Sequence, residues 1–186
     1  NASALITLDA FTTGIINASS ITTLTGSATD QATVRGSSGI TGLPASIASG
    51  SFTQIGSDID GEASGDSSGS SVSLSSDGSV IAIGAWENDG NGSNSGHVRI
   101  YKNLNNTWTQ LGSDINGEAA YDELGYSVSL SADGSVVAVG AHQNLTGSGY
   151  VSIYKNVNGT WTKLGSDIEG EEVSDNSGRS VSLSAD

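Results

Sequence analysis

The sequence has no cysteine, no methionine, one proline and few basic residues. Without cysteine, neither a disulfide nor a thiolate metal site can form. Six Lys and Arg residues face 20 Asp and Glu residues, which gives a net charge of −14. This balance argues against a nucleic-acid or anionic-membrane partner, because both require a positive surface. No apolar run is long enough for a membrane-spanning helix, so we expect no membrane insertion.

The chain is rich in glycine, serine and threonine, and it repeats itself. The segment Ser71–Ala85 recurs almost unchanged at Ser127–Ala141, and it begins a third time at Ser180. Each copy is a short alternating run, an Asp-Gly turn and a continuous apolar run. This pattern predicts two antiparallel strands joined by a tight turn.

A second motif, Gly-Ser-Asp-Ile, marks the period by starting at Gly56, Gly112 and Gly165. Each period holds four strand signals, which in the first period are Ser71–Ser75, Val80–Ala85, His97–Lys102 and Trp108–Ile115. Four antiparallel strands in a repeat of roughly 50 residues are typical of a β-propeller blade. The sequence therefore predicts an all-β fold of antiparallel four-stranded blades, about two complete and others partial.

The blades are expected to stack, because a four-stranded sheet cannot bury both of its faces alone. The run Val136–Val139 is apolar at every position, as in a strand covered on both faces. Phe52, Trp108 and Trp161 recur in register and are predicted to wedge between adjacent sheets. Each would contribute roughly 3–5 kcal/mol relative to alanine if fully buried.

Residues 1–50 differ from the rest, and we predict two domains. The first, 1–50, is a linker or partial repeat of mixed or irregular structure, with a strand-favouring run at 14–26 and a short helix as one interpretation of 27–35. It has too few large apolar residues for a core of its own. The second, 51–186, contains blade-like repeats that start near 56, 112 and 165.

Several of these residues carry a resemblance to a known family. Gly125–Val128 corresponds to a Phe-Gly-x-Ser-Val motif, Gly140-Ala141 to Gly-Ala-Pro, and Tyr150–Tyr154 to a third strand. From Phe52 onward the chain resembles the FG-GAP repeats of integrin-α-type β-propellers. Residues 1–50, especially 18–26, resemble repeats of very large surface proteins of marine cyanobacteria and their phages.

The resemblance has two consequences for the expected structure. The family's calcium loop is shortened to Ser75–Gly78 and Ser131–Gly134, each with one carboxylate, so we expect the usual calcium site to be missing. Two full periods cannot close a ring, because propellers have roughly 4–8 blades. We therefore expect a fragment of a longer chain, or a ring completed by other copies.

An acidic run follows each Gly-Ser. The candidate calcium ligands in it are Asp58, Asp60, Glu62, Asp114, Asn116 and Glu118. In an extended chain, residues two apart point the same way, so each run can present three oxygen ligands to Ca²⁺, which takes six to eight. The alternative is a solvated turn whose acids cap backbone N–H groups. Calcium is the one cofactor for which the sequence offers ligands.

No catalytic signature is present, and we predict that the chain is not an enzyme. His97 and His142 occupy non-equivalent positions in the repeat, and no Gly-x-Ser-x-Gly or His-Glu-x-x-His motif occurs. Trp86 and Tyr121 are either sugar-stacking residues or ordinary packing and loop residues.

These observations favour a non-catalytic structural or adhesion module of a large surface or appendage protein. It would bind a protein or glycan partner, a neighbouring subunit or other copies of itself through its propeller loops. The alternatives are a calcium- or glycan-binding module and a fibre component of a phage virion. The expected location is extracellular, on a cell surface or on a virion surface.

Overall fold

The computed structural model describes residues 53–144 and 147–184, together with the backbone of two short strands near the N-terminus. The chain divides into two compact units, residues 1–54 and 55–186. In the first unit, β1 (Ile16–Asn17) pairs in parallel with β2 (Ile40–Thr41). The segment 27–35, for which a helix is one interpretation, and Phe52 lie outside the described residues.

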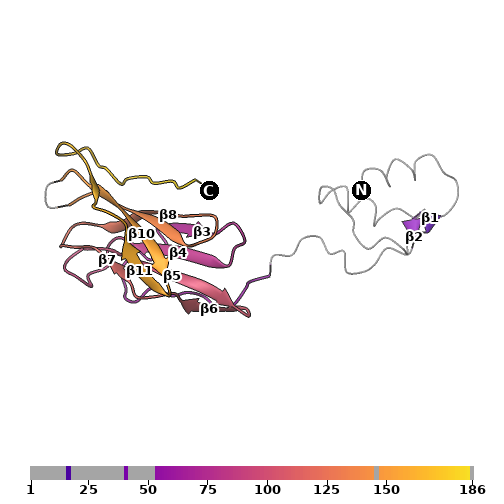
Figure 1. The fold of residues 1–186 in the computed structure, drawn as a ribbon. Coiled ribbons are helices and arrows are strands. Elements are labelled where there is room, and N and C mark those ends of the chain that lie inside the picture. Colours follow the sequence, from indigo (N-terminus) through magenta and orange to yellow (C-terminus); the bar gives the residue numbers. More distant parts are fainter. Residues whose placement is uncertain (1–15, 18–39, 42–52, 145–146, 185–186) are drawn as a thin grey trace. The chain divides into compact units, whose positions relative to one another are not determined.

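The second unit consists of two consecutive antiparallel sheets (Figure 1). The first sheet contains β3 (Ser71–Leu74), β4 (Val80–Ala85), β5 (His97–Leu104), β6 (Thr107–Gln110) and β7 (Ile115–Asn116). The second contains β8 (Leu124–Leu130), β9 (Val136–Ala141), β10 (Tyr150–Val157), β11 (Thr160–Lys163) and β12 (Ile168–Glu169). The described residues include no helix, so the prediction of an all-β fold of four-stranded antiparallel blades is confirmed.

The fourth strand of each blade differs from the prediction. The segment Trp108–Ile115 is not one strand, because β6 pairs with the C-terminal half of β5 while β7 pairs with its first two residues. Gly112, with φ +82°, lies in the gap between the two pieces, and Gly165, with φ +72°, lies in the same gap of the second sheet. This left-handed backbone conformation, which glycine adopts readily, breaks the strand but leaves both pieces beside the same neighbour.

The strands are joined where the turn chemistry predicts. Asp77 and Gly78 turn the chain between β3 and β4, and Gly78 has φ +69°. The turn between β5 and β6 is shorter than the gap between the predicted strands 97–102 and 108–115, because only Asn105 and Asn106 lie between β5 and β6. Both have positive φ, 52° and 64°, as a two-residue hairpin turn that matches the sheet twist requires.

The apolar core lies between the two sheets. Its buried residues come from β4, β5, β7, β8, β9 and β10, and Val98, Val137 and Val139 are fully buried. The continuous apolar run of β9 is thus covered on both faces as expected. Trp161 packs against this core from the second sheet, and its Nε1 donates a hydrogen bond to the main-chain oxygen of Leu111 at 2.7 Å.

The contacts between successive blades are repeated. Ser71 Oγ donates to the main-chain oxygen of Gly125, and Ser127 Oγ donates to that of Gly178, both at 2.7 Å. Likewise, Ser73 Oγ accepts from the N–H of Leu130 at 2.9 Å, and Ser129 Oγ accepts from the N–H of Leu183 at 3.0 Å. The C-terminal segment (yellow in Figure 1) therefore contacts the second sheet as β8 contacts the first.

Candidate functional site

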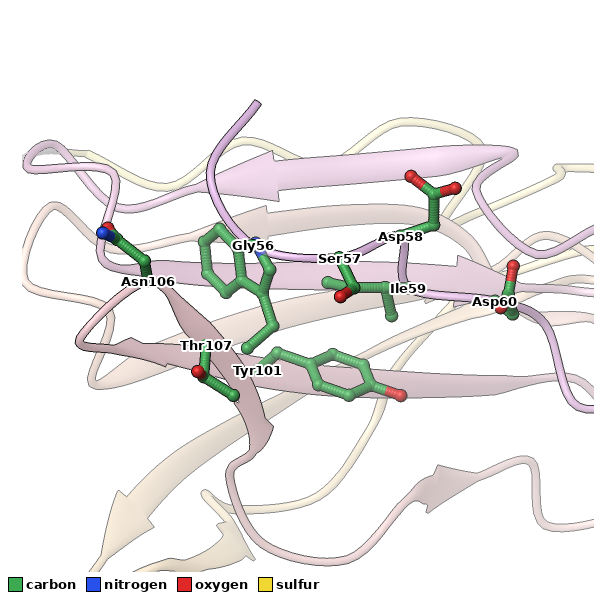
Figure 2. A pocket seen from close by; sticks show the side chains of 9 residues that line it. Gly56, Ser57, Asp58, Ile59, Asp60, Tyr101, Asn106 and Thr107 are labelled. Atoms are coloured by element: carbon green, nitrogen blue, oxygen red, sulfur yellow. The ribbon is translucent and has the colours of Figure 1, made fainter. Parts of the chain in front are cut away.

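The acidic segment 56–62 runs beside the first sheet and forms one wall of a cleft. The cleft has a volume of about 430 Å³, and its opposite wall includes Tyr101, Thr107 and Trp108 (Figure 2). An equivalent cleft of about 340 Å³ lies in the second sheet, between the segment 112–116 and Tyr154, Thr160 and Trp161. The same construction thus occurs once per repeat. In the first cleft one wall is the segment that precedes the first sheet, and in the second cleft it is the tail of the first sheet.

The six predicted calcium ligands do not converge on one point. Asp58 is exposed, and Figure 2 shows its carboxylate pointing away from Tyr101, whereas Ile59 points toward that ring. Asp60 is also exposed, and its main-chain oxygen accepts a hydrogen bond from Arg99 Nη2 at 2.6 Å. Asn116 is exposed on β7 opposite His97. The assignment of calcium to these residues stays a prediction.

Two of the six meet a histidine instead. Glu62, His97 and Asp114 each offer a ligand atom, and these three atoms lie within 4.8 Å of one another. Among the described residues no other group of three His, Asp or Glu side chains is as close. His97 is 1% exposed at the start of β5, and Asp114 is half-buried between β6 and β7. Glu62 enters from the preceding acidic segment.

The charges around His97 act in opposite directions. Burial lowers the pKa of His97, and the nearby Arg99 guanidinium lowers it further, whereas Asp114 and Glu62 act to raise it. The net shift is downward, which favours the neutral imidazole. Glu62 Oε1 lies 3.6 Å from Arg99 Nη1, and Glu62 Oε2 lies 3.8 Å from His97 Nδ1.

The second sheet builds the equivalent position differently. Lys163 Nζ bridges two carboxylates, with 2.7 Å to Glu118 Oε1 and 2.7 Å to an oxygen of Asp167. Burial alone would lower the pKa of Lys163, but its hydrogen bonds to Asp167 and Glu118 raise it. Tyr150 stands where the first sheet has His97, and its hydroxyl donates to Asp122 Oδ2 at 3.1 Å.

The acids that follow each acidic run cap the backbone. Asp66, Asp122 and Asp175 each accept, through Oδ2, the N–H of the residue three positions earlier, at 3.2, 2.8 and 2.8 Å. Asp66 also accepts from Asn88 Nδ2 at 2.8 Å. For these three acids, the interpretation as turn-capping groups accounts for the geometry.

A separate cluster lies at the junction of the two sheets. Tyr126 stacks on His142 with ring centroids 3.8 Å apart, and Trp86 meets Tyr126 edge-on at 5.9 Å. Glu123 Oε2 is 3.1 Å from His142 Nδ1. Burial raises the pKa of Glu123, helped by Glu87, and burial lowers that of His142, helped by Arg179. Trp86 is thus a packing residue, while Tyr121 is 56% exposed on its loop.

Comparison with known families identifies one of these repeats. Residues 58–101 match the model of the FG-GAP repeat. The match spans the acidic segment, β3, β4 and the beginning of β5, so the FG-GAP part of the predicted resemblance is supported by an independent comparison. The second sheet repeats the strand order of the sheet that contains this match. No curated protein matches the chain, and the predicted likeness to cyanobacterial or phage surface proteins stays a prediction.

The sequence analysis did not bring His97 together with Glu62 and Asp114, because it considered each histidine alone. The pairing register brings His97 opposite Asn116 and near Asp114, which are close to one another only after β7 returns to β5. One signal was available in the repeat. Aligning the two periods shows Gln110 where the second has Lys163, and His97 where it has Tyr150.

Proposed function

We propose that this chain is a non-catalytic structural and adhesion module of a larger extracellular or surface-exposed protein. Its FG-GAP blades form a stiff stack, and the loops at one end of the strands present the binding surface. The observation that carries the proposal is the match of residues 58–101 to the FG-GAP repeat, combined with the identical contacts that join successive blades. FG-GAP repeats are generally non-catalytic, which supports the same conclusion.

The binding surface is the end of the sheets that carries the long loops. The loop 86–96 between β4 and β5 lies against the connection 117–123, because Asn91 Nδ2 donates to the main-chain oxygen of Gly117 at 2.7 Å and the N–H of Tyr121 to that of Ser93 at 2.8 Å. Within residues 53–144 and 147–184, the tight hairpin turns between β3 and β4, β5 and β6, β8 and β9, and β10 and β11 lie at the opposite end. Loops rather than strands vary in length between the repeats, so partner recognition belongs at the loop end.

Charge and composition are consistent with this role. The net charge of −14 excludes most anionic partners and keeps the stack soluble. Within the part of the chain that the structure describes, no helix is long and apolar enough to cross a membrane. A rigid acidic scaffold with exposed loops fits a partner such as a protein or glycan on a neighbouring surface, or a neighbouring subunit.

The test uses the binding of the whole chain to immobilised partners. We expect the labelled chain to bind a surface-protein or glycan panel, and Tyr121→Ala to weaken that binding at least tenfold, because Tyr121 is exposed on the loop end. Leu104→Ala is the matched control, since Leu104 is similarly exposed, at 51%, beside a hairpin turn of the opposite end. Equal loss in both variants, or turnover of a hydrolase substrate, would contradict the proposal.

Glycan binding is a second candidate function, favoured by the two equivalent clefts. Each pairs a tryptophan and a tyrosine with carboxylate, hydroxyl and amide groups, a combination suited to the apolar face and polar rim of a sugar. Tyr101→Ala and Tyr154→Ala together should abolish binding to a glycan array if the clefts are responsible. Binding that survives in this double variant assigns recognition to the loops instead.

A further inference from the structure

Adhesion through the loops gives no role to the group of Glu62, His97 and Asp114. An imidazole and two carboxylates drawn from three separate segments place their ligand atoms within 4.8 Å of one another. Glu62 and Asp114 come from successive acidic runs, and His97 begins the strand between them. The group is therefore created where the acidic segment that precedes the first sheet lies on that sheet.

The buried imidazole faces this group without a hydrogen bond. The side chain of His97 is 2% exposed, and its closest charged neighbour is Glu62 Oε2, 3.8 Å from Nδ1. This distance is longer than a hydrogen bond. The imidazole nonetheless faces Glu62, and Asp114 lies beside it, so one imidazole and two carboxylates share a single small space.

The second sheet provides an independent observation, because its equivalent carboxylates hold a cation. Glu118 and Asp167 correspond to Glu62 and Asp114, and the ammonium of Lys163 lies 2.7 Å from both. In the first sheet, Gln110 replaces this lysine and donates a neutral hydrogen bond to Asp114 Oδ1 at 2.6 Å. In the second sheet the positive charge of Lys163 thus lies between the two carboxylates. In the first sheet no lysine is present there, and His97 lies beside the same position.

Arg99 supplies part of the missing charge but does not fill the position. Its Nη2 donates to the main-chain oxygen of Asp60 at 2.6 Å, which anchors the guanidinium to the backbone. Its Nη1 is 3.6 Å from Glu62 Oε1. The other oxygen of Glu62, Oε2, is the one that faces His97. One oxygen of Glu62 thus remains directed at the imidazole.

We propose that Glu62, His97 and Asp114 bind a divalent transition-metal ion, with Zn²⁺ as the reference ion. Imidazole nitrogen together with carboxylate oxygen is a ligand set for zinc and its neighbours, whereas calcium takes oxygen ligands alone and needs six to eight. Three protein ligands leave a fourth position for water or for a group of a partner. The ion would join the acidic segment that precedes the first sheet to that sheet.

Binding requires a small contraction of the group. Ligand atoms about 2.1 Å from a tetrahedral zinc lie about 3.4 Å apart, which is shorter than the upper limit of 4.8 Å seen here. Glu62 can supply this movement, because its side chain is 48% exposed. The imidazole of His97, held in β5, sets the position of the ion.

The experiment titrates the whole chain, freed of metal with a chelator, with ZnCl₂ and separately with CoCl₂. We expect one Zn²⁺ per chain, a rise in Tm, and visible absorption of the Co²⁺ form that indicates a nitrogen ligand. His97→Gln should weaken Zn²⁺ binding at least tenfold. His142→Gln and Glu118→Gln are the matched controls, because they change the other histidine and the equivalent glutamate of the second sheet, and both should bind as the parent does.

A second variant tests the same site without removing a ligand. Gln110→Lys copies the second sheet, so the new ammonium should occupy the position between Glu62 and Asp114 and abolish Zn²⁺ binding while the fold is retained by circular dichroism. This variant keeps the test decisive if His97→Gln does not fold.

Three results would overturn the proposal: no Zn²⁺ binding by the folded chain, binding that is unchanged in both His97→Gln and Gln110→Lys, or binding of Ca²⁺ in preference to Zn²⁺. The loop-end function would stand after any of them, because Tyr121 and the partner panel do not involve this site. Conversely, a chain that binds Zn²⁺ but none of the partners would support the metal site and contradict the loop-end function.

Discussion

At the scale of single residues, the aspartate side chains of the Asp-Gly turns stabilise those turns through hydrogen bonds. Asp77 Oδ1 accepts from Ser75 Oγ at 2.7 Å and from the N–H of Ser79 at 2.9 Å. These hydrogen bonds lower the pKa of Asp77 to about 2, and the same arrangement lowers that of Asp133 to about 2. In each repeat the carboxylate of the Asp-Gly turn therefore stabilises the hairpin.

This geometry predicts an acid dependence of the free energy of unfolding. Because the folded-state pKa of Asp77 lies below the unfolded value of 3.8, its contribution is present above pH 3.8 and is lost as pH falls toward about 2. Asp77→Asn together with Asp133→Asn should flatten the stability curve in this window, measured by urea unfolding at successive pH values. Asp60→Asn controls for the loss of a charge. A double variant with the parent's slope would contradict the assignment.

At the scale of elements, strand β4 of the first sheet approaches β8 of the second so closely that only a small residue fits at the point of contact. A Cβ on Gly84 would overlap the main-chain oxygen of Gly125 in the next blade. Gly84→Ala should therefore destabilise the fold by about 2–3 kcal/mol, measured by chemical denaturation. Gly165→Ala is the control: it has φ +72° and open space around its Cβ, so it should cost only about 1 kcal/mol. Equal costs would show that Gly84 does not control blade spacing.

The tryptophan of the fourth strand is the second element-scale contact. Trp161 packs on the inter-blade core and donates to Leu111, which belongs to the first sheet's tail. It is partly exposed, so Trp161→Ala should cost about 2–4 kcal/mol, below the full value for a buried tryptophan. Unfolding followed by circular dichroism should also become less cooperative, as the sheets lose a shared contact. A loss below about 1 kcal/mol would exclude the wedge role.

At the scale of the molecule, equivalent positions of the two sheets differ in burial because the first sheet covers the second. Leu130 on β8 is 6% exposed, whereas its counterpart Leu74 on β3 is 55% exposed. Leu130→Ala should cost about 2–4 kcal/mol, and Leu74→Ala under about 1 kcal/mol, in the same urea titration. With a blade attached before residue 53, the cost of Leu74→Ala should rise toward that of Leu130→Ala. Similar costs in the present chain would show that β3 is already covered.

The excess of acid also acts on the whole molecule. A net charge of −14 repels itself in the compact state, and this repulsion weakens when salt shortens the Debye length. Raising NaCl from about 20 mM to about 200 mM should therefore raise Tm by a few degrees. The uncharged control is the same titration with sucrose, which at equal concentration should not give the same rise in Tm. A Tm that falls with salt would mean that ion pairs such as those of Lys163 outweigh the repulsion.

The sequence by itself determined the repeat, the all-β architecture and most strand positions, because alternation, Asp-Gly turns and apolar runs act within a few residues of one another. Strand β4 has the bounds that its apolar run predicts. The sequence did not determine that the fourth strand is broken, because a glycine such as Gly112 or Gly165 is compatible both with a strand and with a turn.

Only the tertiary structure decided which acids meet. Glu62, His97 and Asp114 are far apart in the chain, and they come together because the acidic segment lies on the first sheet and β7 returns to β5. Alternation along an extended segment placed Asp58, Asp60 and Glu62 on one face. In the structure the main-chain oxygen of Asp60 instead accepts from Arg99, and Glu62 faces His97, because packing against the sheet, not local geometry, sets where these groups lie.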